Sequence, residues 1–260
     1  MEREKIEYKT AISNTNEYIN ENIEILYEDN YLLVVVKPNN MLSQGDDTKD
    51  KNILDILKEY IRIKENKKGD AFLAMVQRLD RPTSGIMVFA KTSKAASRLS
   101  KEIREKRFEK KYIALAEGYI DGLLRKEINI ENYILKDHEK NISKVAKNAE
   151  EKKDAKKSIM KYKILARHEK STLLDIKLIT GRSHQIRVTL SSLGHPVLGD
   201  VKYAKYFKFG KKTENLALFS YFLKFKHPTK DIDLEFKYVP FKENNLFNEY
   251  KDEILELIYN

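Results

Sequence analysis

The sequence predicts an α+β fold whose sheet is mixed and mostly antiparallel. Predicted strands outnumber predicted helices, and many neighbouring strands are separated by short turns that suit hairpins, which argues against a doubly wound parallel sheet. The chain has 260 residues, of which 41% are hydrophobic. It is therefore long enough to bury a sizeable core.

The N-terminal half begins with a polar segment, residues 1–23, which we expect to be a lead-in to a single domain over residues 24–260. ILYEDNYLLVVV, residues 25–36, is typical of two strands joined by an Asp-Asn turn. Apolar residues at helical spacing predict a helix over 52–63. We then expect strands at 71–76 and 86–90 on either side of a charged turn. A helix at 93–106, capped by Thr92 or Ser93, and a strand at 112–120 follow.

The C-terminal half begins with residues 121–157, a polar, lysine-rich stretch in which we expect irregular strands around a mobile, exposed hairpin. A helix is expected to begin at Ser183, with Gly194 as its left-handed terminator. The remaining elements are strands at 159–166, 172–179, 216–226 and 232–238 and a closing helix at 245–259.

Composition excludes several classes of protein. The chain has no Cys, so it has no disulfides, thiolate metal sites or cysteine nucleophiles. It has neither a signal peptide nor an apolar run near the roughly 18 residues of a membrane helix, and we expect it in the cytoplasm. Its net charge of +10 suits a polyanion such as nucleic acid, or reflects lysine-rich genomic composition. Lysines gather at 64–68, 101–111, 136–157 and 202–212.

The first stretch that suggests chemistry is VQRLDRPTSGIMVFAKT. Pro82 and Gly85 predict a rigid turn between two apolar strands, and Asp80 lies on this turn between Arg78 and Arg81. The two arginines favour an ionised carboxylate, as a nucleophile or a general base requires. The alternative is an ordinary turn aspartate that bonds its own backbone.

The second stretch is LITGRSHQIRVTLSSLGHPVLGDVKYA. The amides at the expected helix start, together with Arg182, suit a phosphate. His184 and Arg187 are expected to share a helix face, and a partly buried Arg187 needs a carboxylate partner, for which Asp80 is our candidate. Alternatively His184 is structural and Arg187 lies on the surface.

These two stretches, in this order, resemble the RluA-type family of RNA pseudouridine synthases. VVVKPNNMLSQ, KKYIALAEG and LALFSYFLKFKHP are similar to further segments of that family, so the resemblance covers residues 24–240. It implies a two-lobed catalytic domain with flanking helices and a basic cleft across its sheet. It also implies an isomerase that converts uridine in RNA to pseudouridine by base flipping, without a metal or organic cofactor.

The resemblance also assigns roles to residues. The family's essential aspartate corresponds to Asp80, the aromatic residue that packs on the target base to Tyr112, and the arginine that pairs with the aspartate to Arg187. Whether Asp80 attacks the sugar or the base stays open. The residues expected to contact RNA are Arg78, Arg81, Thr83, Ser84, Gly85, Arg182, His184 and Gln185. We expect ribosomal or transfer RNA as the partner, no membrane, and a monomer without an obligate protein partner.

The chain departs from the family pattern at Gln77 and Phe219, where relatives usually have histidine. An amide cannot carry charge, so an acid–base role at Gln77 is not expected. The first strand is expected at Ile25, which leaves little chain for an appended RNA-binding domain. Two other classes stay open: a non-catalytic RNA-binding module, and a metal-dependent nuclease, for which ligand spacing is not evident.

Overall fold

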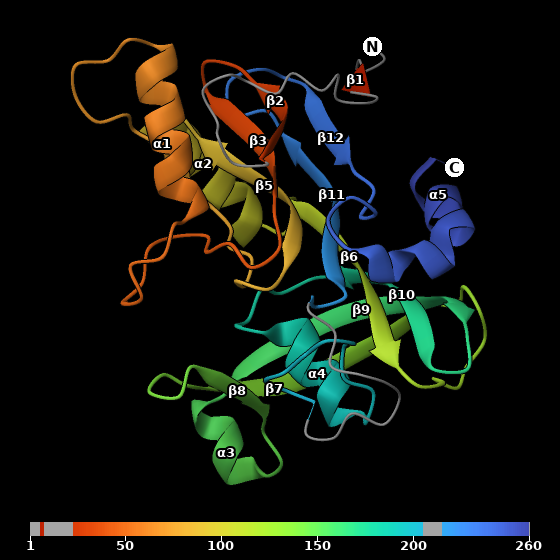
Figure 1. Cartoon of the computed structure of the whole chain (residues 1–260). Coiled ribbons are helices and arrows are strands. Elements are labelled where there is room, and N and C mark those ends of the chain that lie inside the picture. The colour runs from red at the N-terminus through yellow and green to blue at the C-terminus, as the bar shows by residue number, and fades with distance from the viewer. Residues whose placement is uncertain (1–5, 8–22, 205–214, 260) are drawn as a thin grey trace. The chain divides into compact units, whose positions relative to one another are not determined.

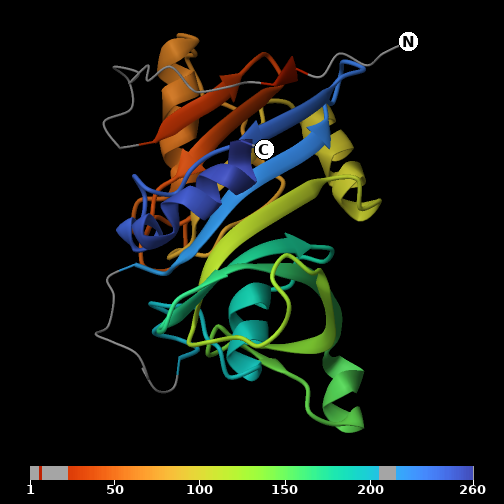
Figure 2. The same cartoon turned by 90° about the vertical axis from the view of Figure 1, so that its right-hand side faces the viewer.

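The computed structural model describes residues 6–7, 23–204 and 215–259 (Figures 1 and 2). The chain divides into two compact units, which are described separately. Unit 1 comprises Met1–Lys110 and Ser220–Glu243, and unit 2 comprises Lys111–Phe219 and Asn244–Asn260. The lysine-rich segment 202–212 falls mostly within residues 205–214, which lie outside the described residues.

Unit 1 contains strands in the order β2-β3-β5-β11, with β4 beside β5, β12 beside β11 and β1 beside β12. The pairs β2–β3, β3–β5, β4–β5 and β11–β12 are antiparallel, and β1 pairs with β12 in parallel. Figure 1 shows α1 and α2 beside these strands. The elements are β1 (Ile6–Glu7), β2 (Glu24–Glu28), β3 (Leu32–Lys37), α1 (Ile53–Lys64), β4 (Ala74–Met75), β5 (Ser84–Ala90), α2 (Ser93–Arg104), β11 (Leu218–Lys226) and β12 (Asp233–Lys237).

The core of unit 1 lies between its sheet and α2. Ala95 and Leu99 of α2 are buried with alternate residues of β3 and β5, such as Val34 and Val88. Burying aliphatic side chains of this size stabilises the fold by about 1.5–3 kcal/mol each. This packing explains why β3 and β5 are continuously apolar: both of their faces are covered.

Unit 2 contains strands in the order β6-β10-β9-β7-β8, and each neighbouring pair is antiparallel. Figure 2 shows α4 lying against these strands. The elements are β6 (Glu109–Glu117), β7 (Ile128–Asp137), β8 (Ile142–Val145), α3 (Ala149–Asp154), β9 (Lys156–Arg167), β10 (Ser171–Leu178), α4 (Gln185–Ser192), the 3-10 helix η1 (Asn245–Tyr250) and α5 (Lys251–Tyr259).

The predicted α+β fold with a mostly antiparallel sheet is confirmed. α1 and α2 each begin directly after a capping residue. The side chain of Asn52 accepts a hydrogen bond from the amide of Asp55 at 3.0 Å, and that of Thr92 accepts one from the amide of Ala95 at 3.2 Å. Gly194 has the positive φ of 86° expected of a helix terminator. The boundaries of the expected lead-in, 1–23, stay a prediction, since only Ile6–Glu7 and Ile23 of it are described.

Several predicted elements differ from the structure in their bounds, including the strand predicted at 112–120, which is β6 at Glu109–Glu117. The strand predicted at 71–76 shortens to Ala74–Met75, because only these residues pair with the far end of β5. Residues 121–157 are more regular than predicted, since β9 holds β7 in register from Ile128 to Ile134. The closing helix begins as a 3-10 turn, and the helix predicted from Ser183 begins at Gln185.

No helix among the described residues is long and apolar enough to span a membrane.

Candidate active site

Asp80 lies on a short turn of unit 1, between β4 and β5. The amide of Thr83 donates a hydrogen bond to the carbonyl of Asp80 at 2.9 Å, which closes the turn. Gly85, the second residue of β5, has a φ of +120°, and a Cβ there would lie 2.4 Å from the carbonyl oxygen of Ser220. A larger residue would therefore displace β11. These contacts confirm the predicted fixed turn and show why it needs a glycine.

Ser43 holds the residue that precedes Asp80. Its hydroxyl donates to the carbonyl of Leu79 at 2.6 Å and accepts from the amide of the same residue at 3.2 Å. Ser43 is only 6% exposed, so water does not compete for these bonds. Both backbone polar groups of Leu79 are thus occupied, which restricts how Asp80 is presented.

Lys37, at the end of β3, is hydrogen-bonded to the same turn. Its side chain is fully buried, and its ammonium donates to the carbonyls of Pro38 at 2.9 Å, Met41 at 2.7 Å and Arg81 at 3.1 Å. Three acceptors match the three N–H groups of a charged lysine. The bond to Arg81 links β3 directly to the Asp80 turn.

The charge of Lys37 depends on its surroundings. Burial lowers the pKa of Lys37 to about 7, while the carboxylates of Asp80 and Glu243 act in the opposite direction. The carboxylate of Asp80 is thus close enough to influence the ammonium. Sequence reasoning missed Lys37 and Ser43. A lysine that ends the apolar run LLVVVK was a usable signal, whereas nothing in the local pattern distinguished Ser43.

The residues of this turn that were expected to contact RNA differ in their exposure and partners. Arg78 is exposed, but the guanidinium of Arg81 pairs with Asp50, with 2.7 Å between Nη1 and Oδ2. Thr83 and Ser84 are buried, and their hydroxyl oxygens have no hydrogen-bond partner within the part of the chain that is described. RNA contact by these residues stays a prediction.

Arg187 lies on α4 of unit 2 and is only 4% exposed. Its Nε is 2.7 Å from Oδ2 of Asp200 and its Nη2 is 2.8 Å from Oδ1, so the two side chains form a buried bidentate pair. Asp200 also accepts from the amides of Lys202 and Tyr203 at 3.0 and 3.1 Å. The buried arginine therefore has a carboxylate partner that sequence reasoning did not choose.

The residues just before α4 differ from the predicted arrangement. His184 has a φ of 54°, so it precedes the helix in a left-handed conformation instead of sharing its face with Arg187. Its Nδ1 is hydrogen-bonded to the hydroxyl of Tyr203. Ser183 is exposed and does not cap the helix, because the capping position falls on His184, which makes no side-chain cap bond.

Gln185 and Arg182 are occupied within unit 2. The amide group of Gln185 donates to the carbonyl of Ile159 at 3.0 Å and accepts from Thr180 and the Arg182 amide at 2.9 and 3.0 Å. The Nε of Arg182 donates to the carbonyl of Lys157 at 2.8 Å. At the expected phosphate-binding helix start, the backbone amides of Arg182 and Gln185 and the side chain of Gln185 are thus engaged inside the unit.

Tyr112 lies in β6 of unit 2, opposite Ile176 of β10, and is 6% exposed. Asp80 belongs to unit 1, whereas Tyr112 and Arg187 belong to unit 2. The structure therefore fixes the surroundings of each residue, and their meeting at one site stays a prediction.

Comparisons with known proteins bear on this arrangement. A family model described as RNA pseudouridylate synthase matches residues 31–192, a range that contains Asp80, Tyr112 and Arg187. A ribosomal large subunit pseudouridine synthase C of Buchnera aphidicola subsp. Schizaphis graminum is 37% identical over 210 residues, which cover 78% of this chain and 63% of that protein. The matched region thus spans less than two thirds of that relative's length.

A tRNA pseudouridine synthase C of Vibrio parahaemolyticus is 32% identical over 235 residues, which cover 83% of this chain and 89% of that protein. The solved structure of human RNA Pseudouridylate Synthase Domain Containing 4 has a TM-score of 0.68 at 21% identity and covers 89% of this chain and 92% of that one, so the fold is the same. The resemblance seen in the sequence is confirmed: the chain belongs to the RNA pseudouridylate synthase family.

Proposed function

We propose that this protein isomerises specific uridines in RNA to pseudouridine and that Asp80 is its catalytic carboxylate. The observation that carries the proposal is the turn of Asp80 within a family-matched region, where Thr83, Ser43 and Lys37 hold the backbone on both sides of the aspartate. A reactive group works best when its position is set before the substrate arrives. An ordinary surface turn does not need this support.

The reaction begins when the target base leaves its stack, since it is inaccessible within paired RNA. Asp80 then attacks a carbon of the nucleotide or stabilises the sugar cation as the glycosidic bond breaks. The free uracil turns and rejoins the sugar through its carbon-5. The proton on carbon-5 must then leave, and the sum of these steps is an isomerisation that consumes no second substrate.

Tyr112 and Arg187 complete the proposed site. Tyr112 packs on the target base, and its hydroxyl relays the proton from carbon-5. Arg187 pairs with the charge of Asp80. The bidentate bond to Asp200 holds the guanidinium in one orientation inside unit 2.

The net charge of the chain and the names of its relatives support RNA as the substrate. The chain has a surplus of ten positive charges, which suits RNA phosphates. The relatives are named for the ribosomal large subunit and for tRNA. We propose that the target uridine lies in ribosomal or transfer RNA.

The direct test maps pseudouridines in total RNA from cells with and without the gene. A site that disappears on deletion and returns with wild type, but not with Asp80→Asn, supports the proposal. If Asp80→Asn restores every site, Asp80 is not catalytic. If deletion changes no site and the purified protein binds RNA without isomerising it, the protein is the non-catalytic RNA-binding module.

The same assay addresses metal chemistry. Isomerisation should persist in a chelator once RNA folding is controlled for. Loss of turnover that one divalent ion restores would contradict the proposed mechanism, which uses the side chains alone.

A further inference from the structure

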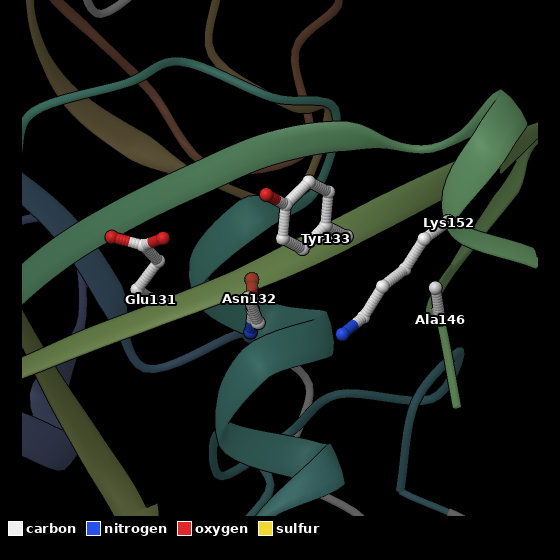
Figure 3. Close-up of a pocket in the computed structure, with 5 residues that line it drawn as sticks. All are labelled: Glu131, Asn132, Tyr133, Ala146 and Lys152. Atoms are coloured by element: carbon white, nitrogen blue, oxygen red, sulfur yellow. The ribbon is translucent and has the colours of Figure 1, made fainter. Parts of the chain in front are cut away.

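A pocket of about 380 Å³ lies in unit 2, and its lining residues do not include those given catalytic roles above. It is lined by Glu131, Asn132 and Tyr133 of β7, by Ala146 after β8 and by Lys152 of α3 (Figure 3). Its volume is at the lower end of pockets that bind small organic molecules. Its lining combines an aromatic ring, an ammonium, an amide and a carboxylate.

The ring and the ammonium already contact each other. The Nζ of Lys152 lies 5.4 Å from the centroid of the Tyr133 ring, and Figure 3 shows this side chain extending from α3 toward the pocket. Aromatic rings beside lysine or arginine are what proteins use to bind single-stranded nucleic acid, because the ring stacks on a base and the cation pairs with a phosphate.

The amide in the pocket is only half satisfied. The Nδ2 of Asn132 donates to Oγ1 of Thr189 on α4 at 3.1 Å. Its Oδ1 is buried and has no hydrogen-bond partner among the described residues. A buried acceptor without a donor is unfavourable. The side chain of Asn132 points toward α4, on the opposite face of β7 from Glu131 and Tyr133, so it closes the floor of the site and does not contact the ligand (Figure 3).

The negative charge in the pocket is compensated. The carboxylate of Glu131 lies 2.7 Å from Nζ of Lys157 on β9. Lys152 also lines the pocket and is exposed. With Glu131 paired, the ammonium of Lys152 is available for a phosphate beside a bound base.

We propose that this pocket binds one unpaired nucleotide of the substrate RNA, other than the uridine that reacts at Asp80. The base stacks on Tyr133 where Lys152 now lies, and the displaced ammonium pairs with the phosphate of that nucleotide. This proposal rests on the proposed function, since it takes RNA to be the substrate. It also assigns the lysine-rich segment 136–157 a defined contact, in place of a general attraction for polyanions.

The absence of Trp from the chain allows a direct test. Tyr133→Trp introduces a single tryptophan into the pocket. Its emission is followed while single-stranded RNA of about eight nucleotides is added, a length within the range of single-strand binding sites. Binding is measured in parallel from the anisotropy of labelled RNA.

The matched control is Tyr119→Trp. Tyr119 is exposed, whereas Tyr133 is partly buried, but Tyr119 likewise has a cation over its ring, with the guanidinium carbon of Arg167 4.9 Å from the centroid, and it does not line the pocket. The proposal predicts saturable quenching in Tyr133→Trp, with the same midpoint as the anisotropy, and little change in Tyr119→Trp. Bound RNA without quenching of Tyr133→Trp overturns it, as does a failure of the RNA to bind.

Two further variants keep the test independent of one substitution. Tyr133→Leu should weaken binding at least about fivefold, the loss expected for one stacked base. Lys152→Gln should reduce the salt slope of binding by about 0.7, the value for one phosphate contact on a single strand, and by more than Lys153→Gln does. Equal effects of the two lysine variants, with unquenched Tyr133→Trp, overturn the proposal.

Failure of this proposal is distinguishable from failure of the proposed function. Quenching without any pseudouridine formation retains the pocket and rejects the isomerase. Asp80-dependent isomerisation without quenching retains the isomerase and rejects the pocket.

Discussion

Arg187 and Asp200 form a buried bidentate ion pair within unit 2, with 2.7 and 2.8 Å between their paired atoms. Asp200 is almost completely buried, at 1% exposure, and it also accepts from two backbone amides of the turn that follows it. This pair orients the guanidinium through α4 and that turn. Asp200 is therefore a positioning residue for the arginine that we place beside Asp80.

Removing Asp200 should destabilise the protein strongly. Asp200→Ala removes the bidentate partner of the buried Arg187 guanidinium, and breaking such a buried pair costs about 3–5 kcal/mol in the free energy of unfolding. Denaturant unfolding measures it. The control is Asp231→Ala, since Asp231 is 82% exposed in its ion pair with Lys226 and should contribute about 1 kcal/mol or less. Equal losses in the two variants would contradict the structural role of Asp200.

Arg187→Lys should impair turnover more than folding. Lysine keeps the charge but lacks the planar fork that binds Asp200 through two nitrogens. We expect a lower kcat with RNA affinity near that of wild type. The proposed contact with Asp80 is checked by an experimental structure with RNA bound, where a separation above about 5 Å between guanidinium and carboxylate exceeds hydrogen-bond range and rules it out.

Asp80→Asn should abolish chemistry and preserve the fold. The side chain is nearly the same size, and the turn bond from Thr83 uses the backbone carbonyl, which the substitution leaves in place. We expect less than about 1% of wild-type turnover, with the melting temperature and RNA affinity little changed. Asp50→Asn, at an exposed carboxylate that pairs with Arg81, serves as the control and should stay active. Turnover well above that level in Asp80→Asn would remove Asp80 from the catalytic role.

Lys37→Met should lower kcat about 10- to 100-fold, because the carbonyl of Arg81 loses its anchor and the Asp80 turn shifts. The variant also loses stability, so it needs a matched control. Lys91→Met removes another lysine of low exposure in unit 1, which pairs with Glu28 and Glu65 at 2.9 Å. Both variants should melt earlier, but only Lys37→Met should lose kcat when assayed well below its melting temperature. If both lose kcat equally, the effect is one of stability.

Asp29 should contribute stability that depends on pH. Burial acts to raise the pKa of Asp29, but hydrogen bonds from the Tyr31 amide, His227 and the Leu32 amide lower it to about 2. The folded pKa is then below the unfolded value of about 3.9. The contribution is fully present above about pH 4 and is lost as the pH falls through about 2.

The measurement compares wild type with Asp29→Asn by denaturant unfolding across this pH range. The difference in the free energy of unfolding should be largest near neutral pH and should shrink toward pH 2. Asp231→Asn, at an exposed carboxylate, should show little difference at any pH. A difference between wild type and Asp29→Asn that is constant with pH would contradict the assignment.

Affinity for substrate RNA should fall log-linearly as salt concentration rises, because phosphate contacts release counterions. Replacing lysines by Gln at 152, 153, 156 and 157 should reduce the slope while sparing turnover at saturating substrate. The lysines at 205, 208, 211 and 212 lie outside the described residues, and their contribution is expected from the sequence alone. Affinity that is nearly constant between low and physiological salt would mean that the excess lysine reflects composition only.

The sequence by itself determined the family, the fold class and most of the elements. Hydrophobic periodicity and capping residues are local properties, so the β2–β3 hairpin, α1 and α2 follow from short windows of the chain. The Pro82–Gly85 turn was readable for the same reason. Two long motifs in one order were sufficient for the family, which the match over residues 31–192 confirms.

Tertiary structure alone decided how the candidate residues are held. Gly85 is required because β11 brings Ser220 against it, a contact across 135 positions that no local pattern encodes. Lys37 acts on the Asp80 turn through the carbonyl of Arg81, 44 residues away. The sequence suggested Asp80 as the carboxylate partner of Arg187, whereas folding placed Asp200 against its guanidinium. Side-chain partners depend on which strands and turns become neighbours, and that is a property of the packed chain.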